Sequence, residues 1–548
     1  MKRLISNLPE YHFEAYFHEE DIVEFGKKLQ RAAPDFIRIG ELGKSAKGRP
    51  ITLFTITDFS SGEAENKPAF YIQGMVHSHE LGSITAPLFA ARELIAGHHS
   101  DGLLEKNTFY IVPRINPDGA ELVLSRGGWI RSRLDEHCDR TRPNTWVEED
   151  IDGNHLILEM RIPDPYGMWE TSPEDSRAMQ LRTPRSTGPF YSILPEGRYL
   201  QYDGSPVWRD GNERVDWNRN YGSHWSPELK NSGAFPHSEQ ELYCLGKFFD
   251  SHRNIVGAAD FHNGPLQILT APCIPEASIA PGDREIFRKC KEIASRCGFE
   301  MSPICNYPSG SNSSPGNFAD WTYFNYGIPG FCIELGTIVS SVFSLDEHKK
   351  IDCSRVAHPR IYHWQEEHPE EPTRLYEWKK FHHPQLGEVE IGGIDVMAYS
   401  MPDKEKMSSY GRMAFEFCCR YMEMAPHLIG RVGAVESLAK DIWRVRCLVF
   451  NEGGLSTALT ARGASLSRRP LPYIEFHPAG EIQCLSMNRG METGHFAAWE
   501  QRWFEWFLGG HAVDEILGEV EIKGCCGISC RIKVTNIAGA VAPANLEG

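Results

Sequence analysis

The chain has 548 residues, of which 41% are hydrophobic and 11% aromatic, and its formal net charge is -17. This length predicts two to four domains with sizeable cores. The negative charge argues against nucleic acid or an anionic membrane as the main partner, because both attract basic surfaces. We expect neither a membrane-spanning segment nor a secretion signal. The 15 cysteines are odd in number and lack zinc-finger spacing, which predicts reduced thiols and a cytoplasmic location.

Strand-type apolar runs alternate with helical periodicity over the first 340 residues. We expect strands near residues 69–72, 108–112, 254–261 and 328–335, and a helix over 83–96. Strands and helices in this order predict an α/β fold, in which functional sites gather where the strands end.

Other parts of the chain have a different texture. Residues 120–210 are rich in Arg, Asp, Pro and Gly, and we interpret them as an insertion with its own small β structure. The charged, His-rich segment 345–385 is expected to be a loop or linker. From about residue 434, short strands separated by Gly, Pro and Asn turns predict a small β-sandwich. The expected domains are therefore 1–433 and 434–548.

The segment YIQGMVHSHE, residues 71–80, suggests a metal site. His77 and Glu80 are three residues apart, so a helical turn would place both side chains on one side, where they could bind one ion. A catalytic zinc takes three protein ligands and keeps one position open. The rest of the chain must then supply another ligand and a base.

Each of these residues also has an ordinary explanation. A chain with 22 histidines contains HxxE by chance, and His262 could be a hydrogen-bonded histidine at a strand end. Arg219 could form a surface ion pair. Glu334 is harder to dismiss, because a carboxylate in an apolar strand costs free energy unless it is paired or lies near a metal. These ordinary explanations weaken together, because all of these residues fall at the ends of successive strands.

The order of the motifs resembles that of a known family. YIQGMVHSHELGS, VPRINPDG, VDWNRN, SEQE, ADFHN, ADW and FCIELGT follow one another as in the zinc carboxypeptidases of the carboxypeptidase A type, the M14 peptidases. The resemblance covers roughly residues 10–340. It implies a mixed, mostly parallel sheet with helices on both faces and one catalytic Zn²⁺ per chain. The catalytic domain would be residues 1–433.

The resemblance also implies a role for individual residues. His77, Glu80 and His262 match the three zinc ligands. Glu334 matches the general base that takes a proton from water and returns it to the leaving amine. Asp216 matches the carboxylate that orients the first histidine ligand.

A second group matches the residues that bind substrate. Asn218 and Arg219 match the pair that grips the substrate's terminal carboxylate, for which a planar guanidinium is well suited. Arg131 best matches the arginine that stabilises the oxyanion, and Arg133 is the competing choice. Tyr307 is the candidate for the family's mobile tyrosine, although it lies farther from the ADW motif than usual.

Two positions depart from the family pattern. His79 stands where the family often has arginine. Ala319 falls where the family reads the terminal side chain, and alanine there predicts a preference for a neutral or otherwise non-basic terminal residue.

The leading interpretation is a zinc metallocarboxypeptidase that hydrolyses the C-terminal peptide bond of a peptide, with Glu334 moving the proton. One alternative is a γ-glutamyl, isopeptide or acyl-amino-acid amidohydrolase with the same zinc site. Another is a non-catalytic peptide-binding module, against which the intact ligand set argues. The expected partner is a peptide or amino-acid conjugate with a free carboxylate. The oligomeric state does not follow from the sequence.

Overall fold

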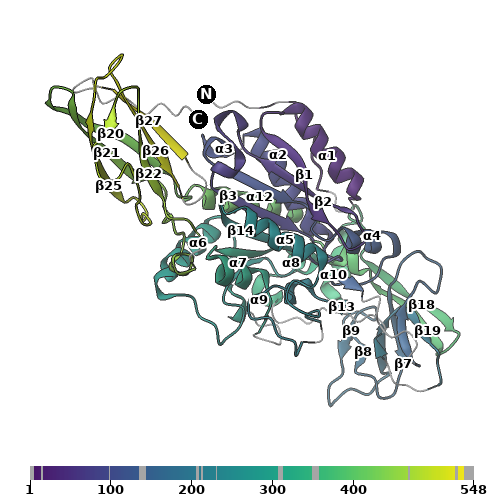
Figure 1. The fold of residues 1–548 in the computed structure, drawn as a ribbon. Helices are drawn as coiled ribbons and strands as arrows, with labels where there is room; N and C mark the ends of the chain where they lie inside the picture. The colour runs from purple at the N-terminus through teal and green to yellow at the C-terminus, as the bar shows by residue number, and fades with distance from the viewer. Residues whose placement is uncertain are drawn as a thin grey trace.

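The computed structural model describes residues 5, 7–13, 17–97, 99–134, 143–204, 209–210, 214–229, 231–306, 313–348, 357–466, 469–524 and 529–535. Three bodies of β structure are visible in Figure 1: a central eight-stranded main sheet, a six-stranded side sheet, and a two-sheet sandwich on the opposite side of the molecule. Among the described residues, no helix combines the length and the apolar character needed to cross a membrane.

The main sheet has a parallel centre and mixed edges. Its strands are β1 (Ile37–Lys44), β2 (Pro50–Ile56), β3 (Ala69–Gly74), β4 (Thr108–Val112), β14 (Ile255–His262), β15 (Gln267–Thr270), β16 (Met301–Pro303) and β17 (Gly330–Glu334). Their order is β1-β2-β4-β3-β14-β17-β15-β16, and the three pairs from β4 to β17 are parallel. Every residue of β3, β4 and β14 is buried, which is why these strands are continuous apolar runs in the sequence.

Helices cover both faces of the main sheet. They include α1 (Glu19–Ala32), α2 (Thr85–Ala96), α5 (Gln240–Ser251), α6 (Arg284–Arg296), α7 (Phe318–Tyr326) and α12 (Lys404–Met422). Neighbouring residues of β3 point to opposite faces. Phe70 packs on Tyr421 of α12 with ring centroids 5.4 Å apart, whereas Tyr71 packs on Phe249 of α5 at 5.1 Å. The predicted α/β fold, with a mixed sheet between two helical layers, is confirmed.

The side sheet combines two distant parts of the chain. Its order is β18-β19-β7-β10-β8-β9, with β7 (Glu159–Pro163), β8 (Trp169–Thr171), β9 (Met179–Leu181), β10 (Tyr191–Pro195), β18 (Leu375–His383) and β19 (Gly387–Ile394). The expected loop or linker at 345–385 is wrong, because this stretch contains α10 (Pro359–Glu367) and β18. Pairing of β19 with β7 completes the sheet.

Shorter elements fill the remaining connections between these bodies. Small sheets are formed by β5 (Arg133–Leu134) with β13 (Arg214–Val215), and by β6 (Thr145–Glu148), β11 (Gly197–Leu200) and β12 (Arg209–Asp210). The short helices are α3 (Leu103–Lys106), α4 (Pro117–Arg126), α8 (Ile338–Val342), α9 (Leu345–His348), α11 (Val396–Tyr399) and α13 (Ala461–Ser465).

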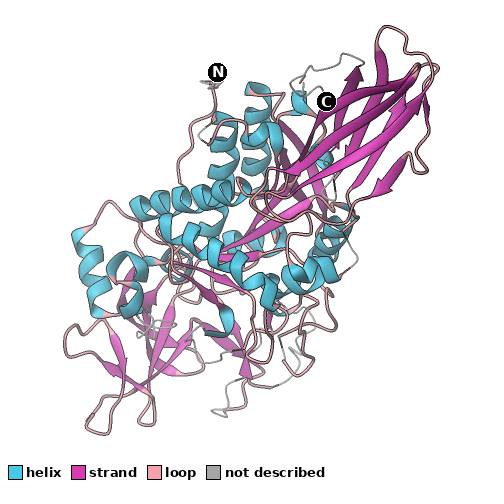
Figure 2. Cartoon of the chain, turned by 90° about the vertical axis from the view of Figure 1, so that its left-hand side faces the viewer, coloured by secondary structure: helices cyan, strands magenta, loops and turns pink. Residues whose placement is uncertain are grey.

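The C-terminal part is a two-sheet sandwich, as predicted. One sheet contains β20 (Leu428–Ala439), β21 (Ile442–Asn451), β25 (Gln501–Gly509) and β23 (Gln483–Cys484), and the other contains β24 (Gly490–Glu492), β22 (Tyr473–Pro478), β26 (Ile516–Lys523) and β27 (Ser529–Thr535). Trp506, Phe476 and Val445 lie in a core shared by both sheets. Figure 2 shows its strands standing apart from the helices that surround the main sheet. β20 runs across the expected boundary at 433/434, and the domain division stays a prediction.

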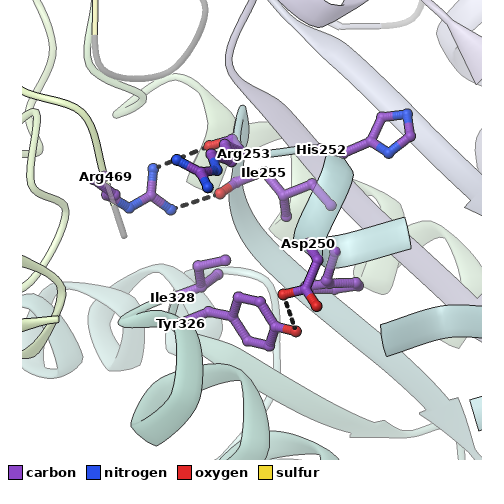
Figure 3. A pocket seen from close by; sticks show the side chains of 8 residues that line it. Asp250, His252, Arg253, Ile255, Tyr326, Ile328 and Arg469 are labelled. Carbon is purple, nitrogen blue, oxygen red and sulfur yellow. Dashed lines mark hydrogen bonds between the residues drawn. The ribbon is translucent and has the colours of Figure 1, made fainter. Parts of the chain in front are cut away.

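A hydrogen bond from Arg469, which lies just before the sandwich strand β22, joins this part of the chain to the beginning of β14. Arg469 is buried, and its Nη2 donates to the carbonyl oxygen of Ile255 at 2.7 Å (Figure 3). Beside it lies a cavity of about 290 Å³ lined by Phe249, Asp250, His252, Arg253, Ile255, Tyr326, Ile328 and Arg469. This contact and the cavity lie at Ile255, the first residue of β14, whereas His262 is the last residue of that strand.

Candidate active site

The first two candidate ligands lie in a tight turn directly after β3. Gly74 ends the strand where a side chain would not fit, because a Cβ there would lie 2.6 Å from the carbonyl oxygen of Ser83. Met75 then takes a left-handed φ of 63°. The amide of Glu80 donates to the carbonyl oxygen of His77 at 3.1 Å, so the backbone makes one turn. His77 and Glu80 therefore point the same way, although they lie in a turn and not in a helix.

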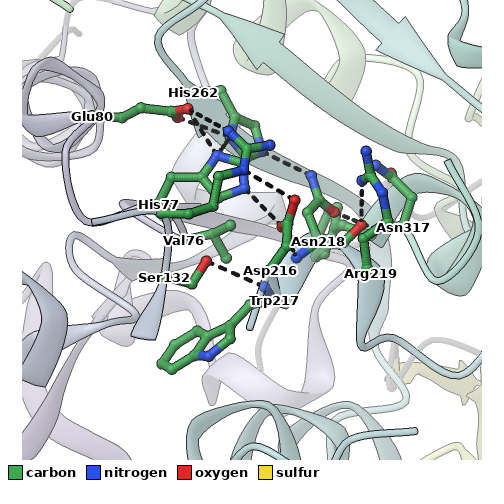
Figure 4. Close-up of polar contacts among 12 residues, drawn as sticks. Val76, His77, Glu80, Ser132, Asp216, Trp217, Asn218, Arg219, His262 and Asn317 are labelled. Carbon is green, nitrogen blue, oxygen red and sulfur yellow. Dashed lines mark hydrogen bonds and ion pairs between the residues drawn. The ribbon is translucent and has the colours of Figure 1, made fainter. Parts of the chain in front are cut away.

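Three ligand-type side chains converge beyond this turn. His77 Nδ1 lies 2.8 Å from Glu80 Oε1, and His262 Nδ1 lies 3.1 Å from Glu80 Oε2 (Figure 4). The two Nδ1 atoms are 3.2 Å apart, and all three side chains are buried. Two imidazole nitrogens that face each other can share at most one hydrogen, so a cation between them would satisfy both lone pairs. Two imidazoles and a carboxylate are the donor set of a catalytic zinc site, and the residues present fit that ion.

A buried carboxylate lies behind the first histidine. Asp216 precedes the 3₁₀ turn Trp217–Arg219, and its Oδ1 lies 3.2 Å from His77 Nε2. Its Oδ2 accepts from Arg131 Nε at 3.0 Å. Burial would raise the pKa of Asp216, but Arg131, Arg219 and His77 outweigh it and hold the pKa well below its usual range. Asp216 is therefore an anion that can fix the orientation of the His77 ring.

Glu334 ends β17, next to β14. In the parallel register its Cα is the partner of His262, so both side chains stand on the same face of the sheet. Burial is the main cause that raises the pKa of Glu334 to about 7, and the negative charge of Glu80 adds to it. Gly264 leaves room for the carboxylate, because a Cβ there would lie 2.6 Å from Glu334 Oε2. A carboxyl that titrates near neutrality suits proton transfer.

The predicted oxyanion-stabilising arginine and the predicted substrate-binding residues adjoin the same cluster. Arg131 Nη1 lies 3.6 Å from Glu80 Oε1. Asn218 Nδ2 lies 3.4 Å from His262 Nε2, and its Oδ1 accepts from the amide of Phe318 at 3.0 Å. Arg219 Nη1 donates to the carbonyl oxygen of Asn218 at 2.7 Å. The side chain of Arg133 and the whole of Tyr307 lie outside the described residues.

The two departures from the family pattern are both buried. His79 Nδ1 lies 3.1 Å from the carbonyl oxygen of Ile130, and burial lowers the pKa of His79 to about 4. Ala319 lies in the first turn of α7. The carboxylate of the adjacent Asp320 accepts from the amide of Cys273 at 2.8 Å and lies 2.7 Å from His224 Nδ1. Neither departure adds a free carboxylate to the site.

Two further residues, Asn263 and Asp260, belong to this cluster and were not expected from the sequence. Asn263 donates its amide hydrogen to Glu80 Oε2 at 3.1 Å. Asp260 Oδ2 lies 3.0 Å from His262 Nε2. A signal for Asp260 was present, because residues two apart on a strand share a face and a carboxylate in an apolar strand needs a reason.

The fold and the ligand set define an α/β protein with a candidate metal site at the carboxyl edge of a mixed sheet. The family model described as zinc carboxypeptidase matches residues 22–353. The chain belongs to this family.

Two named relatives match different extents of the chain. A metallocarboxypeptidase A-like protein of Trichophyton verrucosum is 36% identical over 108 residues, which is 20% of this chain and 25% of that protein. Carboxypeptidase A6 of Mus musculus is 30% identical over 351 residues, 60% of this chain and 62% of that protein. The chain thus spans less than two thirds of these relatives. The crystal structure of carboxypeptidase A from Helicoverpa armigera aligns with a TM-score of 0.41 and 17% identity, covering 62% of this chain and 70% of that one.

Proposed function

We propose that the protein is a zinc metallocarboxypeptidase that hydrolyses the C-terminal peptide bond of peptides. The observation that carries the proposal is the convergence of His77, Glu80 and His262, with Glu334 on the neighbouring strand. Zinc held by these ligands would supply a Lewis acid for the scissile carbonyl and for the attacking water. A cytoplasmic location remains a prediction.

The chain's own groups supply the proton transfer and the charge stabilisation. Glu334 accepts a proton from the attacking water and then donates it to the leaving amine. Burial and the negative charge of Glu80 raise the pKa of Glu334 above that of a solvated carboxyl, which makes it a stronger base for the first of these steps. Arg131, which is held by Asp216, donates to the carbonyl oxygen as negative charge develops there.

Asn218 and Arg219 bind the terminal carboxylate of the substrate. Arg219 offers a planar guanidinium beside the cluster, and Asn218 presents an amide fixed by Phe318. The substrate class is accordingly a peptide, or an amino-acid conjugate, with a free carboxylate. We propose a non-basic terminal residue, because Asp320 behind Ala319 is fully buried and already bonded to His224 and Cys273.

The test combines metal analysis with a matched peptide panel. Purified protein is analysed for zinc and assayed on peptides that differ only in the last residue, each as free acid and as C-terminal amide. We expect one zinc per chain, release of single neutral residues from the free acids, and little release from the amides. Efficient release of Lys or Arg would contradict the terminal-residue preference. Zinc with no peptide cleavage would favour the isopeptide or acyl-amino-acid alternative, and protein without bound metal would favour the binding module.

A further inference from the structure

We infer that Asp260 is a positioning residue of the metal site. It accepts a hydrogen bond from Nε2 of His262 and thereby keeps the lone pair of Nδ1 directed at the ion. This inference rests on the proposed function, because it needs the zinc site to be real. It assigns a role to a buried carboxylate that the family resemblance did not include.

The two ring nitrogens of His262 face different partners. Nδ1 faces His77 Nδ1 at 3.2 Å and Glu80 Oε2 at 3.1 Å, whereas Nε2 faces Asp260 Oδ2 at 3.0 Å. Asp260 and His262 are two apart on β14 and share a face. The imidazole is thus held between the ligand cluster and a carboxylate. His77 has the same arrangement, with Nδ1 on the cluster side and Asp216 at 3.2 Å from Nε2.

Asp260 is buried where few neighbouring groups can compensate its negative charge. The residue is fully buried, and its Oδ1 has no hydrogen-bond partner among the residues that the structure describes. Its cross-strand neighbours are Gln73 of β3 and Cys332 of β17, neither of which is cationic. The Gln73 amide is itself engaged, because it accepts from Tyr71 and donates to Tyr221. A buried carboxylate in such surroundings is costly unless a nearby positive charge compensates it. A divalent ion held by His77, Glu80 and His262 would supply that charge.

The hydrogen on Nε2 has a consequence for substrate binding. Asn218 Nδ2 lies 3.4 Å from Nε2, and the amide of Phe318 fixes the orientation of this side chain by donating to Oδ1. Because Nε2 donates to Asp260, it cannot accept a hydrogen from Asn218. The Nδ2 hydrogens of Asn218 are then left for the substrate's carboxylate. Asp260 therefore acts on both the metal ligand and the neighbouring substrate group, through His262.

Zinc affinity tests the inference independently of peptide cleavage. The dissociation constant is measured by competition with a chromogenic chelator for the wild type, Asp260→Ala and Asp260→Asn, together with the thermal unfolding of each zinc-free protein. We expect Asp260→Ala to weaken zinc binding about 10- to 100-fold. Asp260→Asn keeps the shape and one acceptor oxygen, so it should lose less. If the alanine variant does not fold, the asparagine variant should still bind zinc several-fold more weakly.

Asp320→Asn is the matched control. Asp320 is also a fully buried aspartate bonded to a histidine, His224 at 2.7 Å, but it lies outside the ligand cluster. We expect its zinc affinity to equal that of the wild type. Wild-type zinc affinity in both Asp260 variants would overturn the inference, even if zinc-free protein unfolded at a lower temperature. A wild type that binds no zinc would instead overturn the proposed function.

Discussion

The main sheet and the side sheet bury their residues differently. All eight residues of β14 are buried between two helical layers, whereas β18 alternates between buried, half-buried and exposed positions. A polar side chain within β14 has no water to satisfy it, so it needs a bonded partner or an ion. In β18, lysines at 379 and 380 are solvated. A polar residue is therefore informative in β14, where Asp260 and His262 are bonded to each other at the candidate site, and uninformative in β18.

Removal of zinc is expected to have the largest effect, and this effect should be confined to the main sheet. A chelator should abolish activity, and added zinc should restore it, because the ligand cluster lies entirely at the ends of main-sheet strands and their loops. Zinc at about 100 times its dissociation constant should add roughly 2.7 kcal/mol to stability. Hydrogen exchange should slow at the ends of β3, β14 and β17 and stay unchanged in β7, β10 and β19. Equal slowing in both sheets would contradict the separation between them.

The next largest effect is expected for Glu334→Gln. The amide keeps the shape of the side chain but cannot accept a proton from water, so kcat should fall about 10²- to 10⁴-fold. Zinc content, measured by atomic absorption, should remain at the wild-type level, because Glu334 is not among the ligands. Retained turnover would refute the role of Glu334.

A smaller loss of activity is expected for Gly264→Ala. The new methyl group would lie 2.6 Å from Glu334 Oε2 and displace the carboxylate. Displacing the Glu334 carboxylate from its position should lower kcat/KM about 10- to 100-fold. Gly40→Ala, on β1 of the same sheet, is the control, because nothing lies within 4 Å of its Cβ position. Equal kinetics in the two variants would show that the close approach at Gly264 does not matter.

The smallest effect is expected in the side sheet. Arg161 on β7 donates to Glu390 of β19 at 2.7 Å, and its guanidinium packs over Trp378 of β18. Arg161→Met should lower the stability of the side sheet by about 1–3 kcal/mol while activity changes little. Limited proteolysis with mass mapping measures this local opening.

The exposed pair of Arg198 and Glu149 serves as a control for that change. Their side chains are 48% and 47% exposed, so Arg198→Met should cost less than about 1 kcal/mol. If Arg161→Met reduced activity as much as Gly264→Ala, the two sheets would be coupled, contrary to our expectation.

The same contrast explains what could be predicted from the sequence. Residues 69–74 and 255–262 are apolar runs because both faces of these strands are covered, so the strands were predicted nearly to the residue. The polar residues that end them, His77 and His262, stood out for the same reason. Asp260 lies two residues before His262 in the same buried strand, so the same reasoning applies to it.

The side sheet could not be predicted by such means. Residues 375–383 contain charged and histidine side chains on their exposed face, so the segment looked like a linker. β18 pairs with β19, which in turn pairs with β7. Residues 164–386 separate β7 from β19 in the sequence, and no local pattern predicts such a distant pairing. The turn at 77–80 had a similar limit. Its spacing implied that both side chains share a side, but only the backbone distinguishes a turn from a helix.

The pairing of β7 with β19 also sets an order of events during synthesis. β7 leaves the ribosome before His262 and Glu334, whereas β19 leaves after both. Until β19 is made, one edge of β7 lacks its neighbour, and an open strand edge is where newly made chains pair wrongly. The strands of the main sheet are complete once residue 334 has been made. However, α12, whose Tyr421 packs on Phe70 of β3, is made after β19. The side sheet and the helical cover of the main sheet are therefore both completed only late in synthesis, so the metal-binding strands are made early but reach their final packing late.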